Sequence, residues 1–591
     1  MIFMVKKRIG GALTGWGATR WSATRYLLPL FLLFSCDDKT VPAKVDDPDV
    51  VVTEPAVDPE TAKSIGFFLD NWVEKSFAKP VFTEEKVPTS AAGTVTIDAS
   101  KVITKIPPTI FGHNANIWMS RMVDQPLFMT HITNLKPNVI RFPAGSGSDV
   151  YFWNASPGKL PADVPAQLTA ADGTKKDPGF GYGQTNDDWR ASLDNYYEMR
   201  QQSGNKGVIT VNYGYARYGT SANPVATAAH LAADWVRYDK GRTAYWEIGN
   251  ENYADWEWGY RIDVSKNKDG QPEYLTGKLY AQHFKVFADS MQKAAAEVGA
   301  KIYIGAVMYE SETEVWQVNT TKTWNATMLP EMQNQADFYI VHNYFTPYDQ
   351  NSNAATIYSS ALAQPAKMMH FVTKTIADNG AIQKPIAMTE WNMWARSSKQ
   401  QVSNVSGQFA VLVLGESLTN QYGLAGRWDL LNFWAEGDDH GLFSDGNEPG
   451  VPKWTPRPSF YYLYFLQKMM GDRLVACEMN SGNVNGKAYA STFSSGQLNV
   501  NLVNLTSSAQ TVEVKLKNFN AGERFYWYSL EGSSDNGEFS RKVLINGSAP
   551  SGIAGGPADY ATLKPRSAQS SAGIRFTVPA RGMITAVIEK K

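Results

Sequence analysis

The chain has 591 residues, of which 43% are hydrophobic and 19% are charged, and its formal net charge is −1. This length exceeds what one compact core holds, so we expect two or more domains of ordinary globular composition. The near-neutral charge disfavours nucleic acid or an anionic membrane surface as the main partner and leaves a neutral or mildly charged substrate. The 18 Trp and 28 Tyr are many for core packing alone, and flat aromatic faces suit the C–H faces of sugar rings.

The first 36 residues have the features of a lipoprotein signal peptide. Basic residues precede the apolar run 26–34, which is too short to span a bilayer and fits a secretory signal. The run leads into Leu33-Phe34-Ser35-Cys36, which resembles a bacterial lipobox. The resemblance implies that Cys36 is lipidated and anchors the protein in the bacterial cell envelope, as an outer-membrane or periplasmic lipoprotein. A plain signal peptide is the alternative. Cys477, the other cysteine, is expected to be a buried thiol.

Residues 37–92 are expected to form an acidic tether and an N-terminal extension. From 37 to about 60 the chain is acidic, contains proline and has little apolar periodicity. The pattern around 65–77 is compatible with a short helix. Regular folded sequence is expected from residue 93, where 94–98 alternates like a half-buried strand that could join the C-terminal domain.

Residues 93–472 alternate between strand, loop and helix. Eight such units predict an α/β fold, the (β/α)8 TIM barrel. A doubly wound sheet is the structural alternative, but no Gly-rich phosphate fingerprint follows the first strand. The predicted strands are 109–114, 138–142, 207–212, 244–249, 301–307, 338–342, 385–389 and 428–433. The predicted helices include 225–238, 277–298, 361–377, 406–420 and 459–470.

Residues 473–591 have short strand patterns separated by Gly, Ser, Asn and Pro. This spacing predicts a C-terminal antiparallel β-sandwich. Its predicted strands are 487–493, 497–505, 511–516, 524–530, 541–545, 573–578 and 583–589.

Two glutamates stand where predicted barrel strands open into loops. Glu251 ends the segment Trp246-Glu247-Ile248-Gly249-Asn250-Glu251 after the fourth strand, and Glu390 lies at the end of the seventh. Barrel active sites form at the C-terminal ends of the strands, where these two positions face each other. Paired carboxyls can cleave a glycosidic bond, because one protonates the leaving oxygen while the other attacks or stabilises the anomeric carbon. Glu247 lies on the same side of its strand and is a competing candidate for the acid.

Donors and aromatic side chains fall at the same level as the two glutamates. Long loops at 143–188 and 251–276 are expected to build the walls around the substrate. The candidate substrate-binding residues are Arg141, Asn212, Asn250, His342, Tyr344, Trp391, Trp434 and Trp256.

These motifs resemble clan A of the retaining glycoside hydrolases, whose acid/base follows an Asn at the end of strand four and whose nucleophile ends strand seven. Within the clan, 248–251 and 389–394 are most similar to family 51, which holds α-L-arabinofuranosidases and some endoglucanases. The segment 140–146 resembles that family's second strand, with Ala144 in place of a second Gly. The resemblance covers residues 94–591, although its strong motifs occupy about thirty positions. Endo-acting agarases and porphyranases use the same barrel arrangement and are alternatives to family 51.

The resemblance implies that Glu251 is the general acid that later activates water and that Glu390 is the nucleophile. A nucleophile must stay ionised, for which Arg141, His342 and Tyr344 are available donors. The acid must hold its proton, which a donor-poor setting lined by Trp246 and Trp256 would favour. Asn250 would donate to the sugar hydroxyl beside the reacting carbon.

The sequence therefore predicts a retaining hydrolase of plant or algal polysaccharides or their oligosaccharides, similar to α-L-arabinofuranosidases. An endo-acting β-glycanase and a non-catalytic glycan-binding lipoprotein are the alternatives, and a lyase is a more distant one. The chemistry implies no cofactor and no metal. The acidic run 436–440 could bind calcium, although a solvated loop is the expected reading.

Overall fold

The computed structural model describes residues 53–591 except 144, 349, 395–399, 435–438 and 481–483. Cys36, Ala144 and the first part of the acidic run lie outside the described residues. Within the described part of the chain, no helix has the length and apolar character needed to cross a membrane.

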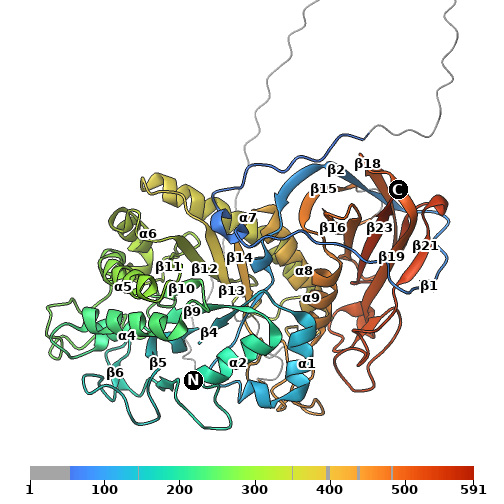
Figure 1. Cartoon of the computed structure of the whole chain (residues 1–591). Coiled ribbons are helices and arrows are strands. Elements are labelled where there is room, and N and C mark those ends of the chain that lie inside the picture. The colour runs from blue at the N-terminus through green and yellow to red at the C-terminus, as the bar shows by residue number, and fades with distance from the viewer. Residues whose placement is uncertain (1–52, 144, 349, 395–399, 435–438, 481–483) are drawn as a thin grey trace, which may run out of the picture. The chain divides into compact units, whose positions relative to one another are not determined.

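Eight parallel strands close into a barrel, which confirms the predicted (β/α)8 fold (Figure 1). Neighbouring strands pair in chain order, and the last strand pairs with the first. The strands are β3 (Gly112–Asn114), β4 (Val139–Phe142), β9 (Lys206–Val211), β10 (Tyr245–Ile248), β11 (Tyr303–Val307), β12 (Phe338–Tyr344), β13 (Ile386–Asn392) and β14 (Leu424–Arg427).

The eighth strand lies earlier than predicted, at 424–427 instead of 428–433. Gly426 explains the difference, because a Cβ at this position would lie 2.7 Å from the carbonyl oxygen of Thr389. The small residue lets β14 approach β13 closely. Beyond Arg427 the chain stays beside the end of β3, where the Leu430 N–H donates to the carbonyl of Asn114.

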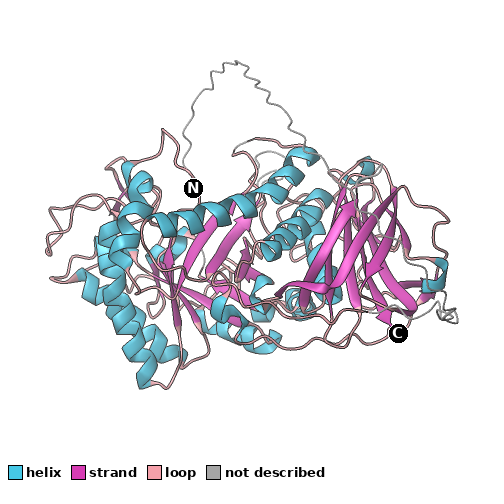
Figure 2. Ribbon diagram, turned by 90° about the horizontal axis from the view of Figure 1, so that it is seen from above, coloured by secondary structure: helices cyan, strands magenta, loops and turns pink. Residues whose placement is uncertain are grey.

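Helices surround the barrel, as the cyan ribbons in Figure 2 show. Several begin at side-chain caps that the sequence supplies. The Asn223 side chain accepts from the Ala226 N–H at the start of α4, and Thr276 accepts from the Leu279 N–H at the start of α5. The helices are α1 (Pro126–Leu135), α2 (Leu193–Ser203), α3 (Gly214–Tyr218), α4 (Pro224–Asp239), α5 (Gly277–Glu297), α6 (Asn319–Met332), α7 (Ala354–Asp378), α8 (Asn404–Thr419) and α9 (Pro458–Met469).

Helix α8 connects the barrel to the second sheet. Nearly every residue of α8 is buried, because one side packs on the barrel and the other on the sheet. Gly415 lies against the ring of Tyr489, where a Cβ would approach within 2.3 Å. The Tyr489 hydroxyl donates to Glu416 at 2.8 Å. The two bodies therefore share a close-packed interface.

The second body is a mixed, curled sheet of eleven strands, consistent with the predicted sandwich. It is not wholly antiparallel, because N-terminal strands join it in parallel: β1 pairs with β21, and β2 pairs with β18. Since β2 also pairs with β15, the barrel begins after Lys105 and not at residue 93. The strands are β1 (Thr83–Glu84), β2 (Gly93–Lys105), β15 (Arg473–Asn480), β16 (Gly486–Thr492), β17 (Leu498–Asn504), β18 (Gln510–Lys517), β19 (Ala521–Gly532), β20 (Val543–Ile545), β21 (Arg566–Gln569), β22 (Arg575–Val578) and β23 (Met583–Lys590).

The N-terminal extension, for which the sequence predicted no role, is packed against the barrel. The short helix expected around 65–77 is a 3-10 helix of four residues, Gly66–Leu69. Ile65 and Phe68 are buried among residues from the N-terminal ends of the barrel strands, and the Ser64 carbonyl accepts from the Ile386 N–H at 2.8 Å. The extension therefore covers the end of the barrel opposite the predicted site.

Candidate active site

The carboxyl groups of Glu251 and Glu390 converge at the C-terminal ends of β10 and β13. An oxygen of each lies within 4.8 Å of an oxygen of the other. Glu390 is inside β13, whereas Glu251 follows a turn that begins at Gly249. That glycine has a φ of +78°, and a Cβ there would lie 2.0 Å from the Asn252 side chain. The turn requires glycine and brings Glu251, itself at a φ of +42°, within hydrogen-bonding distance of His342 in β12.

Arg141 organises the floor of the site. Its Nη1 donates to Glu390 at 2.8 Å, its Nε to Glu247 at 2.6 Å, and its Nη2 to Asn250 at 2.9 Å. Glu247 also accepts from Thr210 at 2.8 Å and is fully buried. It is therefore held in the barrel interior as the counterion of Arg141. This placement favours Glu251 over Glu247 as the residue that faces a substrate.

His342 lies between the two glutamates. Its Nδ1 is 3.0 Å from Glu251 Oε1 and 3.8 Å from Glu390 Oε1, and its Nε2 is 2.9 Å from the Thr389 hydroxyl. Burial lowers the pKa of His342, but the charges of Glu390 and Glu251 raise it overall above its ordinary 6.5. Burial raises the pKa of Glu251, but the hydrogen bond and charge of His342 lower it overall. The two groups therefore form one proton-holding pair.

Tyr344 supplies the second donor to Glu390. Its hydroxyl lies 3.1 Å from Glu390 Oε2. Burial, followed by the charge of Glu390, raises the pKa of Tyr344 well above its ordinary range. The hydroxyl consequently stays protonated, so both oxygens of Glu390 accept a hydrogen bond from a fixed donor.

Asn250 and Trp256 flank Glu251. The Asn250 side chain accepts from Arg141 and donates to Glu257 at 3.1 Å, which fixes the orientation of its amide. The Trp256 indole donates to Glu251 Oε2 at 3.1 Å, although 58% of the Trp256 surface is exposed. Glu251 therefore has two donors, His342 and Trp256, in contrast to the expected donor-poor setting.

Trp246 does not contribute to that setting. It is fully buried, its indole donates to the Thr243 carbonyl, and its ring packs against Trp235 outside the barrel.

Three of the candidate substrate-binding residues are engaged by other parts of the protein. Trp391 follows the register shift in β13 between Met388 and Trp391, points away from the side that carries Glu390, and packs buried beside Phe409 of α8. Both ends of the Asn212 amide form hydrogen bonds within the protein. Its nitrogen donates to the Tyr151 carbonyl and the Tyr218 hydroxyl, and its oxygen accepts from the Tyr215 N–H. Trp434 lies beside the guanidinium groups of Arg457 and Arg541.

The structure adds four buried carboxyl groups near the site that sequence patterns did not single out. Burial raises the pKa of Asp149 and of Glu310 to about 7, and it raises those of Glu257 and Asp429 well above the ordinary range. Oε2 of Glu257, Oε2 of Glu310 and Oδ1 of Asp429 are buried without a hydrogen-bond partner. In the sequence these residues are indistinguishable from solvated loop acids. The sequence signal that could have identified them as site residues is their position shortly after strands β4, β10, β11 and β14.

The end of the acidic run is not a solvated loop. Residues 436–438 lie outside the described residues, but Asp439 is fully buried and paired with Arg457. His440 is also buried, and burial lowers its pKa to about 3. Asp439 and His440 therefore belong to the packed base of this loop.

The three groups Glu251, His342 and Glu390 are of types that bind divalent metals. Arg141 already places a positive charge 2.8 Å from Glu390, and this charge opposes a second cation at the same carboxylate. Hydrogen bonds from Tyr344 and Trp256 occupy further oxygens. The donor set therefore suits acid–base chemistry better than metal binding.

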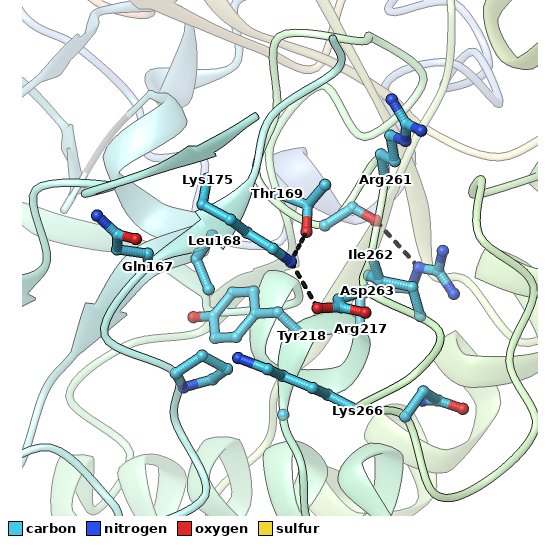
Figure 3. A pocket seen from close by; sticks show the side chains of 14 residues that line it. Gln167, Leu168, Thr169, Lys175, Arg217, Tyr218, Arg261, Ile262, Asp263 and Lys266 are labelled. Carbon is cyan, nitrogen blue, oxygen red and sulfur yellow. Dashed lines mark hydrogen bonds and ion pairs between the residues drawn. The ribbon is translucent and has the colours of Figure 1, made fainter. Parts of the chain in front are cut away.

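A small pocket lies between the loops that follow β4 and β10. Lys175 bridges Thr169 and Asp263 there at 2.7 Å each (Figure 3). Arg217 is buried and donates to backbone carbonyls and to Gln271. None of the candidate site residues lines this pocket. These contacts hold the loop 143–192 against the loop 249–276.

Comparisons with known proteins support the fold. No protein-family model matches the chain, and no curated protein matches it. Among solved structures, the α-L-arabinofuranosidase of Thermotoga maritima in complex with arabinose is 18% identical with a TM-score of 0.58, over 84% of this chain and 100% of that one. The family 51 arabinofuranosidase of Xanthomonas axonopodis pv. citri is 15% identical with a TM-score of 0.56, over 84% and 100% of the two chains. A Paenibacillus polymyxa xyloglucanase of family 44 is 12% identical with a TM-score of 0.52, over 84% and 99%. The chain thus has the fold of the clan A glycoside hydrolases.

Proposed function

We propose that the protein is a retaining glycoside hydrolase that acts on plant or algal polysaccharides or their oligosaccharides. The approach of Glu251 and Glu390 within 4.8 Å carries the proposal. Retaining enzymes hold their two carboxyl groups about 5–5.5 Å apart, whereas inverting enzymes leave about 6.5–9.5 Å for a water molecule. The short separation supports a double displacement.

In the first step, a carboxylate oxygen of Glu390 attacks the anomeric carbon. The bond from that carbon to the leaving oxygen breaks, and the leaving oxygen takes a proton from Glu251. Arg141 and Tyr344 support this role of Glu390, because both donate hydrogen bonds to its carboxyl oxygens. In the second step, Glu251 takes a proton from water, whose oxygen bonds to the anomeric carbon and releases Glu390.

The proton for the first step comes from the pair that Glu251 forms with His342. The resting pKa of Glu251 is lowered by His342, so a proton on the imidazole has to be available to the carboxyl group. The 3.0 Å contact between Nδ1 and Oε1 provides a direct path for that transfer. The pair can therefore supply an acid in one step and a base in the next.

The substrates that we propose first are α-L-arabinofuranosides. The family-51-like segments around Asn250-Glu251 and Glu390 support this specificity, together with the similarity to a structure described as an arabinose complex. An endo-β-glycanase is the alternative, supported by the similarity to a family 44 xyloglucanase. A non-catalytic glycan-binding protein would need the aromatic side chains but not two converging glutamates.

Azide rescue tests the proposal and the two roles together. The full chain is incubated with 4-nitrophenyl α-L-arabinofuranoside and with aryl β-glucosides and β-xylosides. Glu390→Ala is expected to lose turnover, and azide should then yield a glycosyl azide of inverted configuration by entering the vacated face. Glu251→Ala should instead yield an azide of retained configuration, because azide attacks the glycosyl-enzyme. Near-normal activity of Glu390→Ala would contradict the assignment.

We further propose that Cys36 carries a lipid and tethers the enzyme to the cell envelope. The lipobox-like segment 33–36 supports this proposal. Metabolic labelling with an alkyne fatty acid in a bacterial host should mark the wild-type protein and not Cys36→Ser. Equal labelling of both would contradict the proposal.

A further inference from the structure

The exposed aromatic side chains of the described chain all lie on one face. Six Trp, Tyr or Phe side chains have between 42% and 69% of their surface exposed. Each lies in a loop that follows a barrel strand, on the face that carries Glu251 and Glu390. They are Trp189, Trp256, Tyr274, Trp316, Tyr348 and Phe433. Exposed aromatic surface gathered around a site marks an interaction surface.

One series of aromatic rings leads outward from Glu390. Tyr344 donates to Glu390, and its ring lies edge-on to Trp394 with centroids 5.6 Å apart. Trp394 in turn stacks with Tyr348, at 4.8 Å and an interplanar angle of 17°. Tyr348 is 60% exposed, so the series runs from the buried carboxylate to the surface. Its rings come from the end of β12 and from the loops after β12 and β13.

A second aromatic surface begins at Glu251. Trp256 contacts this glutamate directly and comes from the loop after β10. Trp316, in the loop after the neighbouring β11, is also exposed. Under the proposed mechanism, the acid faces the leaving group and the nucleophile faces the other sugar. The two aromatic surfaces therefore extend from the two sides of the bond that is cut.

The charges beside the glutamates favour an uncharged sugar chain. Arg141 and His342 are the cations that contact Glu251 and Glu390 among the described residues. Arg141 is engaged by Glu247, Glu390, Asn250 and Asn114. An acidic sugar at the point of cleavage would meet two carboxyl groups without a cation of its own, and this repulsion would oppose its binding.

The geometry points to an extended, uncharged polysaccharide chain as the occupant of this face, with sugar rings stacked on Tyr348 on one side of the cleaved bond and on Trp256 on the other. The enzyme then cuts inside chains. This inference rests on the proposed function for the positions of acid and nucleophile, and it goes beyond it in naming the mode of action.

The test compares polymers with small substrates, using the full chain. Linear arabinan, arabinoxylan, barley β-glucan, xyloglucan and agarose are the neutral polymers, and polygalacturonate is the acidic one. Viscosity should fall steeply before many reducing ends appear on a neutral polymer. Tyr348→Ala should lower kcat/KM on that polymer about tenfold, the loss of roughly one stacked ring, and should lower kcat/KM on an aryl glycoside by a much smaller factor. Ile382→Ala is the control, because Ile382 is 54% exposed between α7 and β13 at the other end of the barrel, and it should change neither.

The possible outcomes separate the two proposals. Turnover of aryl glycosides with release of monosaccharide only, and slow viscosity loss, would overturn internal cleavage and leave the hydrolase proposal standing. Equal losses on polymer and aryl glycoside in Tyr348→Ala, or faster cleavage of polygalacturonate than of any neutral polymer, would also overturn it. If no substrate is turned over, affinity electrophoresis in gels that contain each polymer still measures binding. Retention that Tyr348→Ala weakens would then support the glycan surface while the hydrolase proposal fails.

Discussion

Nδ1 of His342 lies 3.0 Å from Oε1 of Glu251. This contact ties the acid–base candidate to a ring that can hold the same proton. Burial and His342 act on the pKa of Glu251 in opposite directions, and His342 outweighs burial. The pH dependence of the enzyme should therefore belong to the pair and not to the carboxyl group alone.

His342→Gln should move the alkaline limb of the kcat/KM profile to lower pH. In the wild type, the last proton of the pair can lie on either group, so the pair holds it more tightly than Glu251 alone. Glutamine fills the space without binding that proton. The measurement is kcat/KM for an aryl glycoside between pH 4 and 9 in both proteins. An unchanged or higher alkaline limb in the variant would refute the shared proton.

Arg141→Lys should damage both stability and turnover. A single ammonium group cannot reproduce the fork that serves Glu247, Glu390 and Asn250. The partners left unpaired are buried, so we expect a loss of about 3 kcal/mol in the free energy of unfolding. Without its fixed donor, Glu390 should also lose about 100-fold in kcat.

Arg237→Lys is the matched control for Arg141→Lys. Arg237 forms a surface ion pair with Glu297, so its replacement should cost less than about 1 kcal/mol and leave kcat unchanged. Urea unfolding gives the two free energies. Similar losses in the two variants would mean that the fork of Arg141 is not what stabilises the site.

Glu310→Gln should stabilise the protein at high pH. Burial raises the pKa of Glu310 from 4.5 to about 7. An acid with a raised pKa binds its proton more tightly in the folded state than in the unfolded state. Glu310 therefore does not lower the free energy of unfolding below pH 4.5, lowers it increasingly as the pH rises, and has its full effect above pH 7. The shift corresponds to at most about 3 kcal/mol. The buried Oε2 without a partner is the atom that bears this cost.

Calorimetric scans at pH 5 and pH 8 test this prediction. The variant should match the wild type within a small margin at pH 5 and have a clearly higher Tm at pH 8. Glu312→Gln is the control, because Glu312 is exposed in the same loop and should change the Tm at neither pH. A variant that is less stable than the wild type at pH 8 would show that the charge of Glu310 is compensated in the fold.

The barrel and the two glutamates were predictable because local signals agree with the final structure. Glu251 and Glu390 each end an apolar run that becomes a buried barrel strand, and the barrel itself dictates that such ends meet. Arg141 and Tyr344 could be found for the same reason. By contrast, Trp391 lies on the outer side of β13 beyond a register shift between Met388 and Trp391, and the residue types of the motif give no sign of that shift.

Features that depend on tertiary packing were missed. The position of the eighth strand depends on the close approach of Gly426 to Thr389. A strand of four residues is too short for its hydrophobic pattern to predict such a contact. Asp149 and Glu257 resemble solvated acids in the sequence, yet long loops fold over them and bury them. No role was predicted from the sequence for the extension after residue 60, although Ile65 and Phe68 are apolar anchors on the barrel.

Phe68→Ala tests whether that N-terminal segment is an integral part of the barrel. The Phe68 ring is buried at 5.1 Å from Tyr245 and 5.6 Å from Phe338, measured between ring centroids, and it lies against Gly423. Loss of a buried phenyl ring leaves a cavity and should cost about 3–5 kcal/mol in urea unfolding. Because Phe68 lies at the end of the barrel opposite Glu251 and Glu390, kcat/KM at 25 °C should not change. Val73→Ala, at a position 72% exposed in the same segment, should cost almost nothing. If Phe68→Ala were as stable as Val73→Ala, residues 53–92 would be a tether that merely rests on the barrel.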